Sequence, residues 1–509
     1  MNKLLIIFGL LILLFVLLLS GCDSVTSTPI TAITTTSTLT TLSVSPTTSP
    51  GIYAPTSAIA VTSTSIEATV TSVPVTSVTT TSTSTVPVTT SPPDVPVLYQ
   101  PLYNQLQGYI TNSIGQIAAQ WDGSAYPVNY SAELVTADTN AGPGILQNSE
   151  QQIMIDELNG EAAMGVKTVT VEIGCPVFDP NFYIFSGQTA AQAQQTVQSW
   201  LDYYQSLAQA VHSRGLKMIV ESNPLLSYYI SSNSSFNPGS YYKTLTFAAY
   251  EQLRSRHNII IAQQIKPDYL ILQTEPQTDA VNDFRPELNN ASQDVAMINN
   301  FVSDLNNVGI SGLHTSILLG SGAGTWQPDW KSYFTGLVTI SGLDKIDTHI
   351  YNLQPGINQF GEVAVSEQIA DMAHNAGKGV TMSEFWFHKS SALVGLTENG
   401  DSLTDIRVRD MFGFWAPLDT QAFQMLSDLA NYKHFDYVSS FGHYNWFTLI
   451  DYNSLQTVPV YTPANGAQNA TVDDQITTIL NQAAKQALAG SGLSLTGKAY
   501  QSVISGQSK

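Results

Sequence analysis

Glu275 and Glu384 are the residues of this 509-residue chain whose type and setting could do chemistry. Each stands at the end of a strongly apolar segment, where an acid costs free energy unless it has a use. A pair of facing carboxyl groups can divide the work of a displacement, because one donates a proton while the other attacks or activates water. The sequence therefore presents a candidate acid pair, provided that the fold brings the two segments together.

The two glutamates lie within a repeating pattern of short β-branched segments and longer amphipathic segments. The predicted strands are 132–138, 166–174, 216–222, 268–274, 314–320, 345–351, 379–385 and 436–441. The predicted helices are 150–164, 190–213, 242–266, 291–307, 331–340, 363–376, 404–432 and 473–488. Strands that alternate with helices predict a parallel sheet. Eight such units favour an α/β fold of the closed (β/α)8 type, the TIM barrel. The alternative is an open sheet of six or seven strands in which the first and fifth units are misread.

In a (β/α)8 barrel the functional site forms at the C-terminal ends of the strands. Polar and aromatic residues stand at those ends in this sequence: Asp138, Glu172, Glu221, Asn223, Thr274, Glu275, His349, Tyr351, Glu384, Trp386, His443 and Trp446. Such a ring suits a neutral sugar, because apolar faces stack on sugar rings while polar groups bind hydroxyls. Hydrolysis of a glycosidic bond requires two acids, about 5–5.5 Å apart in a retaining enzyme and about 6.5–9.5 Å apart in an inverting one. The predicted fourth and seventh strands, which carry Glu275 and Glu384, lie across such a barrel mouth from each other.

The order of these motifs resembles clan A of the glycoside hydrolases, the retaining (β/α)8 enzymes of the cellulase, mannanase and galactanase type. The residues that carry the resemblance are Glu275-Pro276 after the fourth strand, His349-x-Tyr351 after the sixth and Glu384 at the end of the seventh. The resemblance implies that Glu275 is the acid/base and Glu384 the nucleophile. It further implies that Tyr351 hydrogen-bonds the nucleophile and that His349 lines the site.

Further residues are predicted to bind the substrate. The resemblance implies that Trp446 is the aromatic platform beneath the sugar at the cleavage point. Thr274 stands where the family usually has an Asn that holds the sugar 2-hydroxyl, which is a departure from the pattern. Glu172, Asn223 and Trp386 belong to the second, third and seventh strand ends, and we expect them to contact the sugar. The departure at Thr274 keeps open a second hypothesis, a non-catalytic carbohydrate-binding protein on a degenerate barrel. A transglycosylase that rebuilds glycans is a third.

The sequence predicts neither a metal site nor a cofactor. The eight His residues are scattered and form no His-x-His pair or His-Glu-x-x-His motif. The two cysteines, Cys22 and Cys175, are too few for a disulfide framework or a Cys-based metal site. The glycine-rich run at 320–324 lacks the Lys-Ser/Thr of a phosphate-binding loop, and we interpret it as a flexible loop at the barrel mouth.

The chain begins with two segments that differ in composition from the rest. Residues 1–22 read as a lipoprotein signal peptide, because an apolar run from Leu4 to Leu19 leads into Leu19-Ser20-Gly21-Cys22. That tetrad resembles a bacterial lipobox, in which Cys22 is acylated; an uncleaved signal anchor is the alternative. Residues 23–97 are rich in Thr, Ser and Pro and predict a disordered linker. Residues 98–509 then form the barrel catalytic domain.

The charge of the chain limits its partners. It contains 39 acidic and 19 basic residues, for a formal net charge of −20. Sparse and scattered Lys and Arg argue against nucleic-acid binding and against attachment to a membrane through basic patches. We expect a carbohydrate substrate, contact with a membrane only through the N-terminal lipid, a position outside the cytoplasm at the cell surface, and a monomer.

Overall fold

The computed structural model describes residues 95–225, 238–351, 361–390, 409–441, 443–455 and 492–506. The predicted signal peptide with Cys22, nearly all of the predicted linker and the predicted helix 473–488 lie outside these ranges. All described residues belong to one compact unit, Pro87–Lys509. Within them, no helix combines the length and the apolar character that a membrane span requires.

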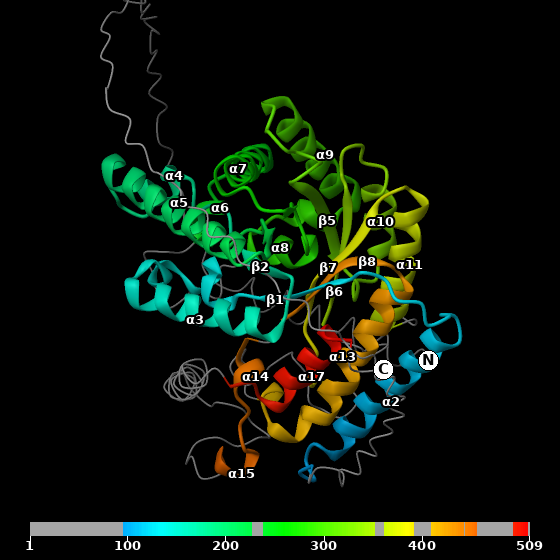
Figure 1. Ribbon diagram of the computed structural model, residues 1–509. Helices are drawn as coiled ribbons and strands as arrows, with labels where there is room; N and C mark the ends of the chain where they lie inside the picture. Colours follow the sequence, from blue (N-terminus) through cyan, green and yellow to red (C-terminus); the bar gives the residue numbers. More distant parts are fainter. Residues whose placement is uncertain are drawn as a thin grey trace, which may run out of the picture. The chain divides into compact units, whose positions relative to one another are not determined.

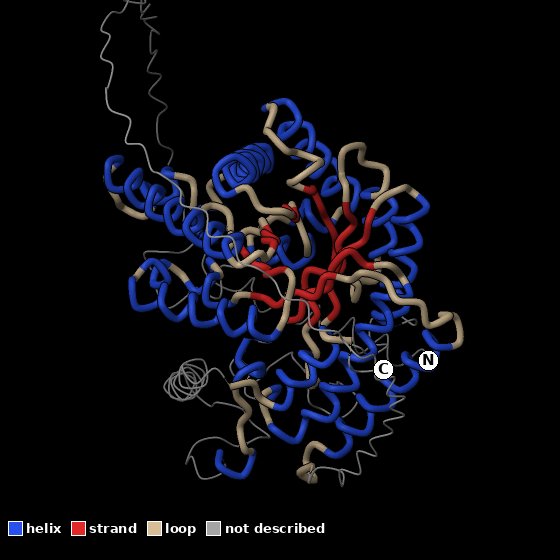
Figure 2. Tube along the Cα trace, viewed as in Figure 1, coloured by secondary structure: helices blue, strands red, loops and turns tan. Residues whose placement is uncertain are grey.

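Eight parallel strands form a closed barrel in the order in which they occur in the chain, so the predicted TIM-barrel fold is confirmed. The strands are β1 Asn129–Glu133, β2 Thr168–Glu172, β3 Lys217–Glu221, β4 Tyr269–Ile271, β5 Leu318–Gly324, β6 Lys345–Ile350, β7 Gly379–Phe385 and β8 Phe435–Ser440. Pairing of β1 with β8, for example Asn129 with Tyr437, closes the sheet. Figure 2 shows the strands at the centre and the helices around them.

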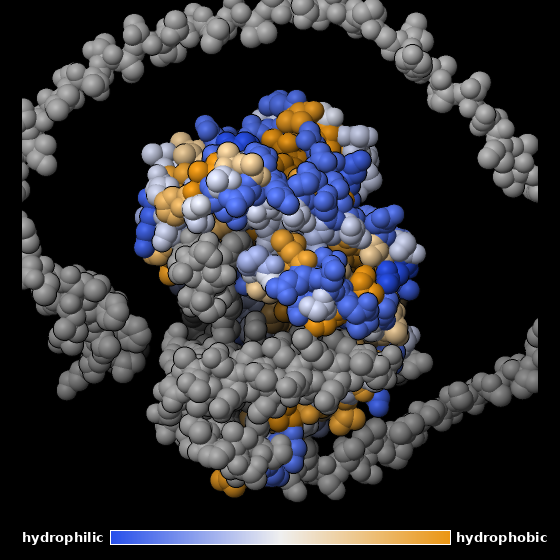
Figure 3. Space-filling view, turned by 90° about the vertical axis from the view of Figure 1, so that its left-hand side faces the viewer, coloured by the Kyte–Doolittle hydropathy of each residue, from blue (hydrophilic) through white to orange (hydrophobic). Residues whose placement is uncertain are grey.

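Helices follow the strands and cover the outside of the barrel (Figure 1). The longer ones are α2 Gln100–Ala118, α3 Asn148–Met164, α5 Ala190–Ser213, α7 Phe247–Ile260, α9 Ala291–Val308, α10 Trp330–Leu337, α11 Gly361–Asn375, α13 Ala416–Tyr432 and α17 Leu495–Ile504. The short ones are α4 Pro180–Phe185, α6 Pro238–Tyr242, α8 Pro276–Asn282, α14 His443–Phe447 and α15 Tyr452–Leu455. Figure 3 shows mixed hydrophilic and hydrophobic residues on one face of the described part.

Helix α5 illustrates how local sequence sets these elements. Thr189 and Gln192 form a capping box at its first turn, which satisfies backbone donors that a helix otherwise leaves open. Trp200, Tyr204 and Leu207 follow at helical spacing and are fully buried. The observed bounds are those that the sequence predicted.

Two strand predictions were displaced along the chain. The first strand ends at Glu133, and Asp138 instead caps a short 3-10 turn by accepting a hydrogen bond from the Asn140 amide. The fifth strand is Leu318–Gly324, so the glycine-rich run 320–324 is strand and not a mouth loop. Its glycines are needed for close packing, because a Cβ at position 322 would meet the backbone oxygen of Asp347 on β6.

We predict that Gly322→Ala destabilises the barrel by about 1–3 kcal/mol, the usual cost of forcing extra volume into a packed interior. The new methyl group would collide with the Asp347 carbonyl, and backbone paired within a closed sheet has little room to shift. Thermal or urea unfolding of the full chain measures the effect. Gly108→Ala is the control, because Gly108 is exposed on helix α2 with open space around it, and this variant should gain up to about 1 kcal/mol of stability. Equal stability of the two variants would contradict the packing argument.

Candidate active site

Strands β1, β2 and β3 end in Glu133, Glu172 and Glu221, which we call the acid layer. Lower in the barrel, the Ser131 Oγ of β1 lies 3.2 Å from the Thr170 Oγ1 of β2. Side chains alternate along a strand, so Glu133 and Glu172, two residues further on, point to the same inward face. Glu172 is in register with Glu221 of β3. Three glutamates from neighbouring strands therefore gather at the C-terminal end of the barrel.

Tyr351 joins the two predicted catalytic acids. Its hydroxyl lies 2.5 Å from the Glu275 Oε1, and it also hydrogen-bonds the Glu384 Oε2, which is the contact that the sequence predicted. Carboxyl oxygens that share one hydroxyl are within about 5.5 Å of each other, two hydrogen-bond lengths. A hydroxyl donates only one proton, so the second contact requires that the other carboxyl group carries a proton of its own.

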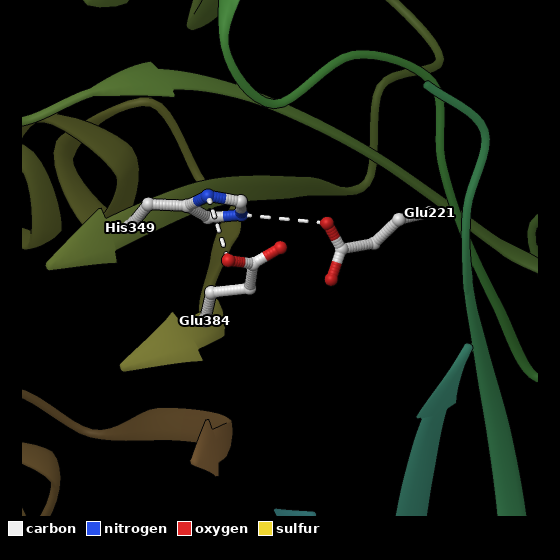
Figure 4. A group of neighbouring side chains, drawn as sticks. All are labelled: Glu221, His349 and Glu384. Carbon is white, nitrogen blue, oxygen red and sulfur yellow. Dashed lines mark ion pairs between the residues drawn. The ribbon is translucent and has the colours of Figure 1, made fainter. Parts of the chain in front are cut away.

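His349 lies among the carboxylates and is almost fully buried. Its Nδ1 is 2.9 Å from the Glu275 Oε1 and 4.0 Å from the Glu384 Oε2. Its Nε2 is 3.5 Å from the Glu221 Oε2 and 3.5 Å from the Asp347 Oδ2. Figure 4 shows Glu221 and Glu384 approaching the imidazole from two different strands.

Proton affinities in this group follow from burial and charge. Burial alone would lower the pKa of His349, but the surrounding carboxylates raise it well above its ordinary value. Burial opposes ionisation of Glu275, yet the contacts with His349 and Tyr351 outweigh it and lower the pKa of Glu275. Burial raises the pKa of Glu384, which keeps weaker contact with His349 and is repelled by Glu221 and Glu275. In the unliganded site the proton affinities of His349 and Glu384 are therefore raised, and that of Glu275 is lowered.

The pKa values of the acid layer, from β1 to β3, are also shifted by burial and charge. Burial, followed by repulsion from neighbouring acids, raises the pKa of Glu133 and Glu172 well above the ordinary value. Burial also raises the pKa of Glu221, although the contact with His349 opposes it. The Glu133 Oε2, Glu172 Oε1 and Glu221 Oε1 have no hydrogen-bond partner among the described residues.

Thr274 and Asn223 are buried beside the acids. The Thr274 hydroxyl donates to the Asn223 Oδ1 at 3.0 Å, and the Asn223 Nδ2 lies 3.5 Å from the Glu221 Oε2. The departure at Thr274 therefore builds a short polar chain that orients the Asn223 amide. That amide is a hydrogen-bonding group next to Glu221.

Aromatic rings surround Tyr351. Trp386 is half-buried, donates its indole N–H to the Asp410 Oδ2 at 3.0 Å, and lies with its ring centroid 6.3 Å from that of Tyr351. Trp326 lies closer, at 4.8 Å, and His388 stacks on Tyr351 at 5.6 Å. Trp386 was predicted for the site. Trp326 and His388 were not among the predicted site residues.

The structure does not bring Trp446 into this group. Trp446 lies on α14, where its buried ring stacks on Tyr500 of α17 at 4.6 Å and tilts against Phe423 of α13 at 5.5 Å. The side chain thus packs among helices outside the barrel. Strand β8 ends at Ser440, and position 446 already belongs to a helical turn. The predicted aromatic platform at Trp446 is wrong.

One group of described residues could hold a metal ion. Donor atoms of Glu221, His349 and Glu384 all lie within 4.8 Å of one another. These donors come from three strands, so no short spacing in the sequence marks them. Glu133 and Asp347 were also absent from the predicted site, Glu133 because the first strand was placed too late in the chain.

Comparison with solved structures finds distant similarity. No protein-family model and no curated protein matches the chain. An exo-β-1,4-mannosidase, Op5Man5 from Opitutaceae bacterium strain TAV5, has 13% identity and a TM-score of 0.41, with 72% of this chain and 62% of that chain covered. An endo-β-1,4-mannanase from Thermotoga petrophila has 12% identity and a TM-score of 0.36, with 72% and 78% covered. The chain thus spans less than two thirds of the mannosidase. Identities this low leave the activity to be judged from the site itself.

We predict that Glu133→Gln stabilises the protein at pH 7. The pKa of Glu133 is near 4.5 in the unfolded chain and higher in the folded one, so the carboxyl penalises folding increasingly as the pH rises above about 4.5. An amide removes the buried charge, and we expect a Tm increase of about 2 °C, equivalent to about 1 kcal/mol in a large domain. The gain should vanish at pH 4, where both states are protonated. Asp202→Asn, an exposed change on α5, should shift the Tm at neither pH. A Tm loss for Glu133→Gln at pH 7 would show that the carboxylate stabilises the fold.

Proposed function

We propose that this chain is a glycoside hydrolase that cleaves a β-linked poly- or oligosaccharide with retention of configuration. The single observation that supports it most is the hydroxyl of Tyr351, which holds Glu275 and Glu384 within about 5.5 Å of each other. This separation suits a carboxylate that attacks the sugar directly. It leaves no room for the water that an inverting enzyme places between its acids.

In the proposed reaction Glu384 attacks the anomeric carbon, and the bond to the leaving oxygen breaks as Glu275 gives that oxygen a proton. The product is a glycosyl ester of Glu384. Glu275 then takes a proton from a water molecule, whose oxygen attacks the same carbon and releases the ester. Two inversions give net retention.

The proton for the first step is held next to Glu275. His349 is kept protonated by the carboxylates around it, and its Nδ1 lies 2.9 Å from the Glu275 Oε1. A proton that moves along this contact makes Glu275 the acid. Glu384 attacks as the carboxylate, so any proton it holds passes to solvent first, and the hydrogen bond from Tyr351 then stabilises the carboxylate.

We further propose that the enzyme works outside the cytoplasm at the cell surface. The lipobox-like segment that ends at Cys22 and the Thr- and Ser-rich segment 23–97 support this proposal. An acyl chain on Cys22 would anchor a monomer to the membrane, and the linker would hold the barrel away from it.

We predict that Glu384→Gln and Glu275→Gln lose activity in different ways. Replacement of Glu384 removes the nucleophile, and we expect kcat to fall at least about 10³-fold on every substrate. Loss of the general acid should cost about 10²–10⁴-fold where the leaving group needs protonation, but far less for an activated aryl β-glycoside. Kinetics on both substrate types measure the split, and proton NMR of the first product shows its anomeric configuration.

Azide separates the two roles. It should restore turnover to Glu275→Ala with a β-glycosyl azide as product, and to Glu384→Ala with an α-glycosyl azide. Glu161→Gln, a buried acid on α3, is a control expected to retain wild-type kinetics. Full activity in both site variants, or an inverted product from the wild type, would contradict the mechanism. Glycan binding without turnover on any substrate would favour a carbohydrate-binding protein instead.

A further inference from the structure

The acids at the barrel mouth outnumber the cations there. Five buried carboxyl groups and the partly buried Glu275 surround the site; the five are those of Glu133, Glu172, Glu221, Asp347 and Glu384. Their ion pairs within the described residues all run to the single imidazole of His349. The proposed hydrolysis uses Glu275 and Glu384 only. It gives no reason for acids at the ends of β1, β2 and β3.

Several buried charges elsewhere in the described chain have partners. Lys389 lies 2.7 Å from Asp419. Arg254, which is fully buried, donates to the carbonyl oxygens of Ser222 and Leu272 and to two side chains. Such pairing is the rule, because an unpaired buried charge is costly. The buried acids Glu161 on α3 and Asp294 on α9 also lack hydrogen-bond partners among the described residues, but the acid layer gathers several such groups at the end of the barrel where Glu275 and Glu384 lie.

Three oxygens of the acid layer are left open. The Glu133 Oε2, Glu172 Oε1 and Glu221 Oε1 accept no hydrogen bond from a described residue, although 8% or less of each side chain is exposed. Glu133 and Glu172 also form no ion pair within the described ranges. All three side chains face inward at the end of the barrel where Glu275 and Glu384 lie. Open acceptors that face a substrate site call for donors on the substrate.

We propose that the substrate is a β-linked glycan whose sugars carry a free, protonated amino group, and that the Glu133, Glu172 and Glu221 carboxylates bind this ammonium. The inference rests on the proposed glycosidase function and names its substrate class. A primary ammonium offers three N–H donors and one positive charge, which matches three carboxylate acceptors short of a cation. A neutral sugar hydroxyl supplies one donor and no charge.

The same ammonium would prepare the nucleophile. Glu384 is repelled by Glu221 and Glu275, and this repulsion disfavours its ionisation in the unliganded site. A positive charge bound beside Glu221 offsets that repulsion. Binding of the amino sugar would thus help Glu384 to ionise when the anomeric carbon is in place.

A metal ion accounts for less of this arrangement. The group that could hold one consists of Glu221, His349 and Glu384. An ion there would leave the open oxygens of Glu133 and Glu172 without a partner. It would also occupy the carboxylate that the proposed mechanism needs as its nucleophile.

Three hexasaccharides test the inference on the full-length protein: β-1,4-linked glucosamine, its fully N-acetylated counterpart and cellohexaose. An aryl β-glucoside serves as an activated neutral substrate. At pH 5.5 we expect kcat/KM for the glucosamine hexamer to exceed that for either neutral hexamer at least about tenfold. N-acetylation should abolish the preference, because it removes the charge and leaves the chain otherwise similar.

The variants Glu133→Gln and Glu172→Gln test the residues. Each should lower kcat/KM for the glucosamine hexamer about 10- to 100-fold more than for the aryl β-glucoside, the usual effect of a lost hydrogen bond to a charged group. Glu161→Gln is the matched control, since both of its buried carboxyl oxygens also lack partners but lie on α3. It should keep the wild-type ratio. Thermal unfolding verifies that each variant is folded.

The outcomes separate the two proposals. Hydrolysis of the neutral hexamers at rates equal to or above that of the glucosamine hexamer overturns the inference and leaves the glycosidase intact. An unchanged ratio in both variants overturns it as well. Zn²⁺ that binds in calorimetry and requires Glu221 would assign the acid surplus to a metal and also overturn it. Failure to cleave any substrate, the aryl β-glucoside included, removes the glycosidase itself.

Discussion

Closure of the parallel sheet by pairing of β1 with β8 is the constraint on which the site depends. A closed barrel brings the C-terminal ends of all its strands to one rim, whatever their separation in the chain. Glu275 after β4 and Glu384 on β7 thus come near enough to share the hydroxyl of Tyr351. Without closure, the acids of β1 and those of β7 would stand at opposite edges of an open sheet.

Paired charges outside the barrel stabilise the rim formed by the C-terminal ends of the strands. Lys389 and Trp386 follow β7, and both bind Asp410, one through its backbone amide and the other through its indole. The Lys389 ammonium reaches Asp419 of α13, which also accepts a hydrogen bond from Thr496 of α17. These contacts tie the segment after Glu384 to the C-terminal helix. On this side of the barrel the buried charges are therefore paired, whereas the acid layer leaves carboxyl oxygens open.

That contrast gives the site its electrostatic character. Carboxyl groups crowded around one imidazole disfavour one another's ionisation, so the pKa values of His349 and Glu384 are raised. The arrangement lowers the stability of the folded state at neutral pH, as expected where function and stability conflict. A substrate that brings positive charge would relieve the crowding, whereas a neutral one would leave it in place.

Much of the fold followed from local patterns. The alternation of β-branched and amphipathic segments predicted eight units, and α5 and β7 were located to the residue because caps and hydrophobic periodicity are local properties. The fifth strand was misplaced because its glycines read as a loop in isolation. Their reason, the close approach of β6 at Asp347, is a contact between distant segments.

The sequence by itself determined the barrel, the acids at its strand ends and the aromatic residues near them, because each of these features depends on residues that are neighbours in the chain. Only the tertiary structure decided which side chains meet. It placed Trp446 among helices and joined Glu275 and Glu384 through Tyr351. It also brought Glu133 and Glu172 together at a barrel mouth where carboxyl groups outnumber cations. The distances between these side chains, their burial and their mutual repulsion depend on segments that are far apart in the chain, so no local sequence pattern predicts them.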